Sequence, residues 1–310
     1  MMHSICKNFL VILSSAVSLT TFASESCKNY TENIVSCDTS DMNDIIRRTH
    51  HEEKLTSSSH ILMAFDIDNT LLTTQPGFDL GTTQWWDWQN DLINNDKSSP
   101  FLVATNFNEL IQINNFIIPL MQTKKIDENI DVQIKREQSH GVKVIALTSR
   151  DTGLFPATEK QLVNNNINLK SEWSRELETQ GPFVPPNFDF TRPLLYTNGI
   201  FMTTGQNKGI VLQYILNQFL LVTKAQPQVI IFIDDSQKNI DNVNAAFKNI
   251  NNIRLFTYRY SKEEERVNNF ANNKNQEKET AQKQWISIKS IQGQWLNMRG
   301  IFNGAFNTAF

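Results

Sequence analysis

The stretch Ile61-Leu-Met-Ala-Phe-Asp66-Ile-Asp68-Asn-Thr70-Leu-Leu72 decides the fold. Five apolar residues in a row are typical of a strand buried in a parallel sheet that is covered on both faces. Strand side chains alternate with a period of two, so a regular strand would place Asp66 and Asp68 on one side. Two carboxylates at the end of a buried strand are costly unless a cation or a reaction uses them. The plain alternative is a strand that ends in a solvated acidic turn.

Two further apolar stretches repeat this arrangement of a buried strand followed by polar residues. Residues 142–148 end in Thr148, and residues 228–233 are followed by Asp234 and Asp235. Predicted helices alternate with the strands, over residues 39–56, 106–118, 126–139, 157–165, 209–222 and 237–248. This alternation predicts an α/β fold with a doubly wound, Rossmann-like parallel sheet and helices on both faces.

The sequence divides into a leader, an arm, one large domain and a tail. Residues 1–23 have a basic start, an apolar run and a small-residue cleavage site, which predict a signal peptide; an uncleaved anchor is the alternative, but the run is short for a membrane span. Residues 24–58 are expected to form an N-terminal arm and helix. Residues 59–260 are predicted to form the main domain. Residues 261–310, rich in Glu, Lys, Asn and Gln, are predicted to form a charged helical segment and tail.

A small cap or flap is predicted at residues 73–130, directly after the acidic strand. Its first part, residues 73–103, has no clear periodicity and contains Pro76-Gly77. The cluster of tryptophans between Trp85 and Trp88 is interpreted either as a hydrophobic plug or as a substrate-facing surface. Further along, Asn198-Gly199 between two short apolar runs predicts a hairpin over residues 194–203.

The cysteines indicate an oxidising compartment. Cys6 lies in the leader, so Cys27 and Cys37 remain as a pair in an exported chain, and a disulfide between them is expected. Neither cysteine is near a histidine cluster, which argues against a thiol nucleophile or a zinc site. The pair His50-His51 is interpreted as a surface helix pair and not as a set of metal ligands.

Size and charge limit the possible partners. The chain has 310 residues, of which 40% are hydrophobic, enough for a sizeable core. The net charge of -3 gives no basic field that would attract nucleic acid. After removal of the leader, no stable membrane span is expected, and the oligomeric state is left open.

The carboxyl ends of the predicted strands carry a coherent set of chemical groups. In an open α/β sheet these ends form the binding crevice. The carboxylates expected there are Asp66, Asp68, Asp234 and Asp235, and four of them predict a hard divalent cation, for which Mg²⁺ fits best. Thr148 adds a hydroxyl group, and Lys208, just before a predicted helix, adds an ammonium group. Phosphoryl transfer needs this combination of metal, nucleophile, acid and positive charge.

With these residues in order, the chain resembles the haloacid dehalogenase-like (HAD) phosphohydrolases. The motifs that carry the resemblance are Asp66-Ile-Asp68-Asn-Thr70, Leu147-Thr148-Ser149-Arg150, Lys208 and Phe232-Ile-Asp234-Asp235-Ser236. The resemblance covers roughly residues 60–258. The chain is also similar to secreted class B acid phosphatases and to an uncharacterised HAD-like family of intracellular bacterial pathogens.

The resemblance implies a role for each aspartate. Asp66 would attack phosphorus and become an aspartyl phosphate, while Asp68 would protonate the leaving oxygen and then deprotonate the attacking water. Mg²⁺ would bind the Asp66 carboxylate, the Asp68 backbone carbonyl and a motif-four aspartate. Class B enzymes have Gly-Asp at motif four, so the alignment makes Asp235 the direct ligand, with Asp234 in support or bound through water.

The resemblance also implies the phosphate-binding residues. Thr148 would hydrogen-bond a phosphate oxygen, and Lys208 would pair with Asp66 and the phosphate. Arg150 and Asp151 are interpreted as local salt-bridge partners and are left out of the catalytic set.

Two functions follow as alternatives. The first is an exported, periplasmic or secreted, Mg²⁺-dependent phosphatase acting on a small-molecule phosphate ester, with transfer to an alcohol also possible. The second is a secreted binding or surface-interaction protein on the same scaffold with little turnover. The presence of Asp66, Asp68 and Lys208 together favours the enzyme, because a binding scaffold has no chemical need for this set.

Overall fold

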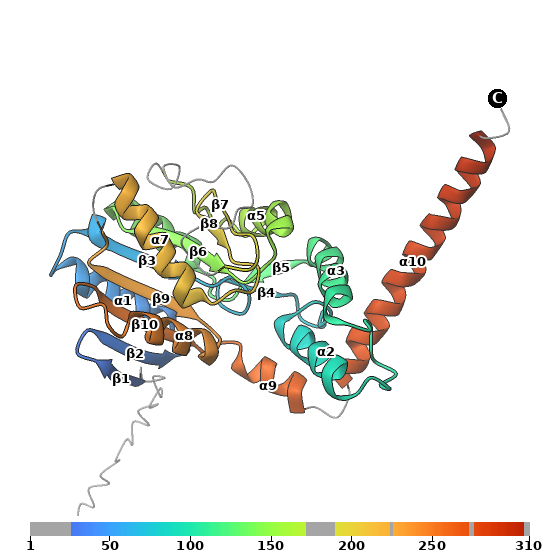
Figure 1. The fold of residues 1–310 in the computed structure, drawn as a ribbon, viewed down its shortest axis with the longest axis horizontal. Coiled ribbons are helices and arrows are strands. Elements are labelled where there is room, and N and C mark those ends of the chain that lie inside the picture. The colour runs from blue at the N-terminus through green and yellow to red at the C-terminus, as the bar shows by residue number, and fades with distance from the viewer. Residues whose placement is uncertain (1–25, 172–189, 224–225, 273–275, 307–310) are drawn as a thin grey trace, which may run out of the picture.

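The computed structural model describes residues 26–171, 190–223, 226–272 and 276–306; the predicted signal peptide lies outside them. An eight-stranded sheet with the order β1-β2-β10-β9-β3-β6-β8-β7 forms the centre of the molecule (Figure 1). Its strands are β1 (Ser26–Thr31), β2 (Ile34–Thr39), β3 (Ile61–Phe65), β6 (Lys143–Thr148), β7 (Leu195–Thr197), β8 (Ile200–Met202), β9 (Val229–Asp234) and β10 (Arg254–Tyr260). All neighbours pair in parallel except the two edge strands, β1 and β7. The predicted, mostly parallel α/β sheet is confirmed.

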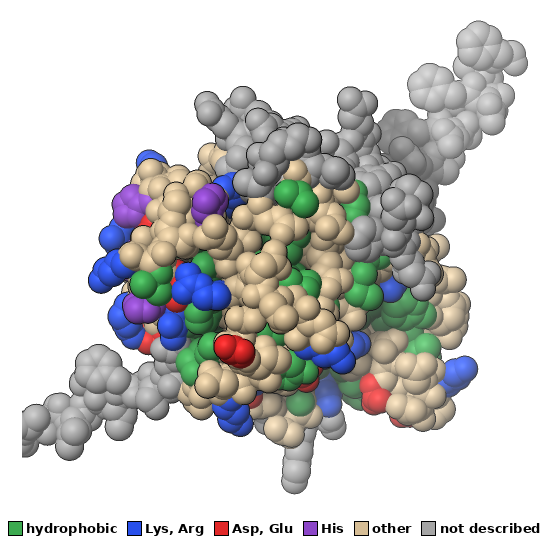
Figure 2. Space-filling view, turned by 60° about the vertical axis from the view of Figure 1, so that its left-hand side comes forward, with side chains coloured by type: hydrophobic (Ala, Val, Ile, Leu, Met, Phe, Trp, Pro, Cys, Tyr) green, Lys and Arg blue, Asp and Glu red, His purple; other side chains and the backbone are tan. Residues whose placement is uncertain are grey.

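Helices cover both faces of this sheet. On β3, Ile61, Met63 and Phe65 face one hydrophobic core, and Leu62 and Ala64 face the other. The first core is covered by α1 (Met42–Glu53), α4 (Ile130–His140) and α5 (Phe155–Asn164), and the second by α7 (Lys208–Thr223) and α8 (Gln237–Phe247). Two covered faces explain why the central strands read as continuous apolar runs. On the face in Figure 2, hydrophobic side chains form only separate patches.

Several elements begin and end at the residues that the sequence indicates. The Asp41 side chain accepts a hydrogen bond from the Asn43 amide at the start of α1. Helix α3 (Phe107–Ile117) begins in the same way, with Asn106 accepting from the Glu109 amide. Gly141 ends α4 with a φ of 97°, a left-handed conformation that glycine adopts without steric cost. Each of these signals involves residues that are close together in the sequence, so it can be recognised without knowledge of the tertiary fold.

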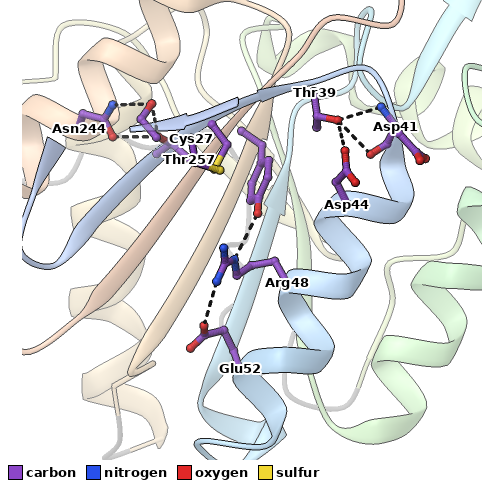
Figure 3. Close-up of a disulfide and its surroundings, with 11 residues drawn as sticks. Cys27, Thr39, Asp41, Asp44, Arg48, Glu52, Asn244 and Thr257 are labelled. Atoms are coloured by element: carbon purple, nitrogen blue, oxygen red, sulfur yellow. Dashed lines mark hydrogen bonds and ion pairs between the residues drawn. A yellow bond between two sulfur atoms is a disulfide. The ribbon is translucent and has the colours of Figure 1, made fainter. Parts of the chain in front are cut away.

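The predicted N-terminal arm is a β-hairpin that extends the sheet. Strand β2 pairs in parallel with β10, and β1 pairs with β2 in antiparallel register, with Cys27 opposite Cys37. The predicted disulfide is confirmed and joins these two residues, whose Cα atoms are 4.0 Å apart (Figure 3). In the same view, Asn244 and Thr257 are joined by a hydrogen bond of 3.0 Å between α8 and β10. The disulfide therefore fastens the outermost strand to the sheet.

An insertion separates β3 from α4. It leaves the sheet through β4 (Leu72–Thr74) and returns through β5 (Thr123–Lys125), and these two strands pair with each other. Between them lie α2 (Thr83–Asn95), α3 and the short η2 (Ile118–Leu120). The prediction that residues 73–103 are irregular is wrong over α2, where Thr82 caps the helix by accepting a hydrogen bond from the Trp85 amide.

The tryptophans of α2 pack inside the insertion and against helix α9 (Glu264–Asn272). Trp85 is only 1% exposed. Trp86 makes an edge contact with Phe107 of α3, and Trp88 makes one with Phe270 of α9. These contacts are of the kind that the hydrophobic-plug interpretation predicts, while the substrate-facing alternative is untested.

The last described element is the long helix α10 (Gln276–Phe306), which projects away from the sheet (Figure 1). Its first turns contact the insertion, where the Gln284 side chain accepts hydrogen bonds from the Asp79 and Leu80 amides. Within the described ranges, no helix combines the length and the apolar character that crossing a membrane requires.

Candidate active site

The structure brings the predicted site residues together at one edge of the sheet. Asp66 directly follows β3, Thr148 is the last residue of β6, and Asp234 is the last residue of β9. Strands β9, β3 and β6 are neighbours, so their carboxyl ends lie side by side. Lys208 begins α7, which packs on the second face of the sheet and carries this lysine to the same edge.

Lys208 is the buried centre of the site, with its side chain 1% exposed. Its ammonium group donates to Asp66 Oδ1 and to Asp234 Oδ2, the latter at 2.7 Å. Burial alone would lower the pKa of Lys208, but the carboxylates of Asp234 and Asp66 outweigh burial and raise the pKa above its ordinary value. The ammonium group is therefore held charged between two carboxylates.

Asp234 and Asp235 have different surroundings although they are adjacent. Asp234 is fully buried and accepts hydrogen bonds from Lys208, from the Ser236 amide at 2.9 Å, and from the Asn239 side chain at 3.0 and 3.1 Å. Asp235 is half-buried and accepts a hydrogen bond from Asn69. Burial and the Asp234 carboxylate raise the pKa of Asp235 to about 7. The oxygens of Asp234 are thus engaged by protein donors to a greater extent than those of Asp235.

Three carboxylates at this edge lie close enough to share a cation. Asp66, Asp234 and Asp235 each offer one oxygen, and these oxygens lie within 4.8 Å of one another. Burial, together with the other carboxylates, raises the pKa of Asp66 well above its ordinary value, against the opposing effect of Lys208. One ammonium group faces three carboxylates, so the cluster has a net negative charge when all three are ionised. An all-oxygen donor set with excess negative charge fits a hard divalent cation.

Asp68 lies at the exposed side of the site and is held by Arg150. Its side chain is 36% exposed. Arg150 donates to both carboxylate oxygens, from Nε at 2.9 Å and from Nη2 at 2.7 Å. The buried guanidinium group is fixed in turn by Thr158 at 3.1 Å and Gln161 at 2.7 Å. This bidentate geometry fixes the orientation of the Asp68 carboxylate.

The interpretation of Arg150 as a local salt-bridge partner is therefore wrong in one respect. Arg150 does form an ion pair, but its partner lies 82 positions away and belongs to the predicted catalytic set. Both residues follow neighbouring parallel strands, β3 and β6. The contact between Arg150 and Asp68 could have been anticipated from the position of Arg150, which lies two residues after Thr148 and so at the same edge of the sheet as Asp68.

The insertion covers the site next to Asp68. The Asn69 side chain, on a residue with a φ of 58°, contacts Gln84 of α2 at 3.5 Å. A small pocket lies between this turn and the insertion, lined by Asp68, Asn69, Leu72, Thr73, Thr74, Thr82, Thr83, Met121 and Thr123. Two larger cavities, of about 520 and 710 Å³, lie further out and are lined by none of the predicted catalytic residues. The approach to Asp68 is therefore bounded by the insertion.

Thr148 is fully buried at the end of β6. Its hydroxyl oxygen accepts a hydrogen bond from the Arg150 amide at 3.2 Å. The structure thus orders the turn after β6 around this hydroxyl group. All the residues predicted for the site, except the two cysteines of the disulfide, lie at this one edge of the sheet.

Comparison with known families places the chain in one of them. Residues 38–299 match the family described as "Protein of unknown function (DUF2608)". The chain belongs to this family. The matched region contains the sheet from β3 onward, the insertion and every residue of the site described above. A search of curated proteins found no match.

Proposed function

We propose that this protein is an exported, Mg²⁺-dependent phosphatase of the HAD type that hydrolyses a small-molecule phosphate monoester through an aspartyl phosphate. The observation that carries the proposal is the buried Lys208, which bridges Asp66 and Asp234 at the carboxyl ends of neighbouring strands. Together with Asp68 on the exposed side, this arrangement supplies a nucleophile, a fixed positive charge and an acid at one edge.

Asp66 is the nucleophile in this proposal. Its carboxylate attacks phosphorus, a P–O bond forms to Asp66, and the bond to the leaving oxygen breaks. The charged Lys208, hydrogen-bonded to Asp66 Oδ1, holds the carboxylate in place and offsets the negative charge of the incoming phosphate. The Thr148 hydroxyl oxygen already accepts the Arg150 amide, which leaves its hydrogen for a phosphate oxygen.

Asp68 handles the protons. It gives a proton to the leaving oxygen and then removes one from the water that hydrolyses the aspartyl phosphate. Arg150 keeps the carboxylate oriented during both steps. An alcohol in place of water would give phosphotransfer by the same route.

The donor set favours Asp235 over Asp234 as the direct metal ligand. The oxygens of Asp234 accept from Lys208, Ser236 and Asn239, whereas Asp235 is half-buried with Asn69 beside it. We therefore assign Asp66, Asp235 and the Asp68 backbone carbonyl to Mg²⁺, with Asp234 in support. When bound, Mg²⁺ would neutralise charge on the reacting oxygens.

Export is supported by the disulfide between Cys27 and Cys37, because disulfides persist in oxidising compartments. The predicted signal peptide at residues 1–23 agrees with this location. The proposal therefore places the protein in the periplasm or outside the cell.

The test is hydrolysis of para-nitrophenyl phosphate by the mature protein with Mg²⁺. We expect Asp66→Asn to lower kcat by at least about 10³-fold, because the nucleophile is lost. A matched control is Asp151→Asn, at the same edge, whose side chain caps the next turn through the Gly153 amide and which we expect to retain activity. No turnover across a broad panel of phosphate esters, with Mg²⁺ bound, would favour the binding protein instead.

A further inference from the structure

A second cluster of possible metal ligands lies at the opposite edge of the sheet. Helices α1 and α4 end just before β3 and β6 begin, so their last turns lie at the amino ends of these strands. The last turn of α1 carries His50 and Glu53, and that of α4 carries Glu137 and His140. Each helix thus contributes one histidine and one glutamate three positions apart, a spacing that places both on one helix face.

The four side chains face one another across the two helices. His50 Nε2 lies 2.9 Å from Glu137 Oε1, and His140 Nδ1 lies 3.5 Å from Glu53 Oε1. One ligand atom from each of His50, Glu53 and Glu137 lies within 4.8 Å of the others. Ser58 also donates to Glu53 Oε1 at 3.0 Å, which holds this carboxylate in place. Histidine side chains gather on one side of the molecule in Figure 2.

The side chain of Glu137 gives independent evidence that this cluster binds a cation. Its side chain is only 1% exposed, and its second oxygen, Oε2, has no hydrogen-bond partner among the described residues. A buried carboxylate oxygen without a partner is costly. Burial raises the pKa of Glu137, while the His50 hydrogen bond opposes this shift. A cation between the helices would satisfy the free oxygen and offset the charge of Glu53 as well.

We propose that His50, Glu53, Glu137 and His140 form a divalent transition-metal site, with Zn²⁺ as the ion that fits best. Two imidazoles and two carboxylates are the donors that Zn²⁺ takes in tetrahedral sites, whereas Mg²⁺ prefers oxygen alone. His50 and His140 are 27% and 43% exposed, so both rings have room to turn toward the ion. The bound ion fastens the end of α1 to the end of α4.

The site differs from the catalytic edge in chemistry and in place. The catalytic edge has only oxygen donors and a buried lysine, and it lies at the other end of the same strands. The interpretation of His50-His51 as a surface pair holds for His51, which is exposed, but His50 turns toward Glu137.

The test is calorimetric titration of the mature, untagged protein with Zn²⁺ in excess Mg²⁺, which occupies oxygen-only sites. We expect one Zn²⁺ to bind, and His140→Ala and Glu137→Gln each to weaken the affinity at least about tenfold, since even the groups that merely orient metal ligands are worth that much. His51→Ala and His60→Ala are the matched controls and should bind as the wild type does.

Imidazole NMR gives a second readout on the same samples. Zn²⁺ should shift the ring signals of His50 and His140 and leave those of His51 and His60 unchanged. Absence of Zn²⁺ binding would overturn the proposal, as would wild-type affinity in both His50→Ala and His140→Ala, or binding that only Asp235→Asn abolishes. If Glu137→Gln does not fold, the two histidine variants decide, because their side chains are partly exposed.

Discussion

Arg150 and Arg266 each join parts of the chain that are far apart in sequence, but only Arg150 binds a carboxylate of the candidate active site. Arg150 is buried and binds the partly exposed carboxylate of Asp68 in the candidate active site. Arg266, on α9, donates to the Thr73 hydroxyl at 2.6 Å and to the Thr74 and Phe78 carbonyls at 3.1 and 3.0 Å. Arg150 therefore orients the proposed acid-base residue, whereas Arg266 fixes the backbone at the start of the insertion.

The two arginines should therefore differ in the property that their replacement changes, catalytic rate for one and stability for the other. An arginine that presents a carboxylate to an open pocket affects the reaction if it is shortened. Arg266 binds carbonyls and hydroxyls and also lies 3.6 Å from the carboxylates of Asp79 and Glu263, none of them in the candidate active site, so shortening it should affect the stability of the segment that it ties down. The following variants test whether the two regions can be separated in this way.

Of the two arginine variants, Arg150→Lys is expected to have the larger effect. Lysine keeps the charge but cannot form the two-pronged contact, so the Asp68 carboxylate loses its fixed orientation. We expect kcat for para-nitrophenyl phosphate to fall about 10²-fold, the scale on which a misplaced catalytic group costs activity. Arg254→Lys, at the other end of the sheet and also ion-paired, is the control. Wild-type kcat in Arg150→Lys would remove the distinction between the two arginines.

A smaller and different effect is expected for Arg266→Ala. The carbonyls of Thr74 and Phe78 lose the hydrogen bonds from Arg266, which we expect to lower the free energy of unfolding by about 2 kcal/mol. Urea denaturation measures this loss, and hydrogen exchange should show faster opening of residues 73–80. Lys262→Ala, an exposed neighbour, should change stability by less than about 0.5 kcal/mol. Unchanged exchange at residues 73–80 would contradict the supporting role.

A third expected effect is a pH dependence of stability at the candidate active site. In the metal-free protein, the pKa of Asp235 rises from 3.8 to about 7, so the native state binds more protons than the unfolded state in this window. The free energy of unfolding should therefore fall as pH rises through this range, and the raised pKa of Asp66 acts in the same direction.

Mg²⁺ should counteract this loss, because it binds the ionised carboxylates. We expect the rise in Tm caused by Mg²⁺ to grow between about pH 5 and about pH 8. Asp235→Asn, which cannot ionise, should flatten this dependence. A Mg²⁺ effect that does not change with pH would show that these carboxylates are not its ligands.

The elements that could be predicted from the sequence are those whose own residues indicate them. The central strands are apolar on both faces, and the caps at Asp41, Asn106 and Gly141 are local. Strand β2 escaped prediction because its partly polar sequence is made a strand by pairing with β10. Helix α2 escaped because two of its buried positions, Gln84 and Gln89, are polar.

The site was predicted as a set of residues but not as a network of contacts. The sequence motifs contain Asp66, Asp68, Thr148, Lys208 and Asp234. The order of the strands brings these residues together. The contact between Arg150 and Asp68 depends on the adjacency of β3 and β6, which local sequence does not encode. The same holds for Glu137 and His50, whose contact depends on how α4 packs beside α1.

The most direct test of the central claim is a single turnover of para-nitrophenyl phosphate in oxygen-18 water, followed by mass spectrometry of the peptide that contains Asp66. If Asp66 forms an aspartyl phosphate, water attacks phosphorus in the second step, and the label appears in the released phosphate during the first turnover. The Asp66 carboxylate then keeps its own oxygens, while acid quenching of Asp68→Asn traps the phosphorylated Asp66 peptide. Labelled phosphate with the phosphopeptide is the predicted result. Turnover without any phosphorylated Asp66, in the wild type or in Asp68→Asn, would contradict the account.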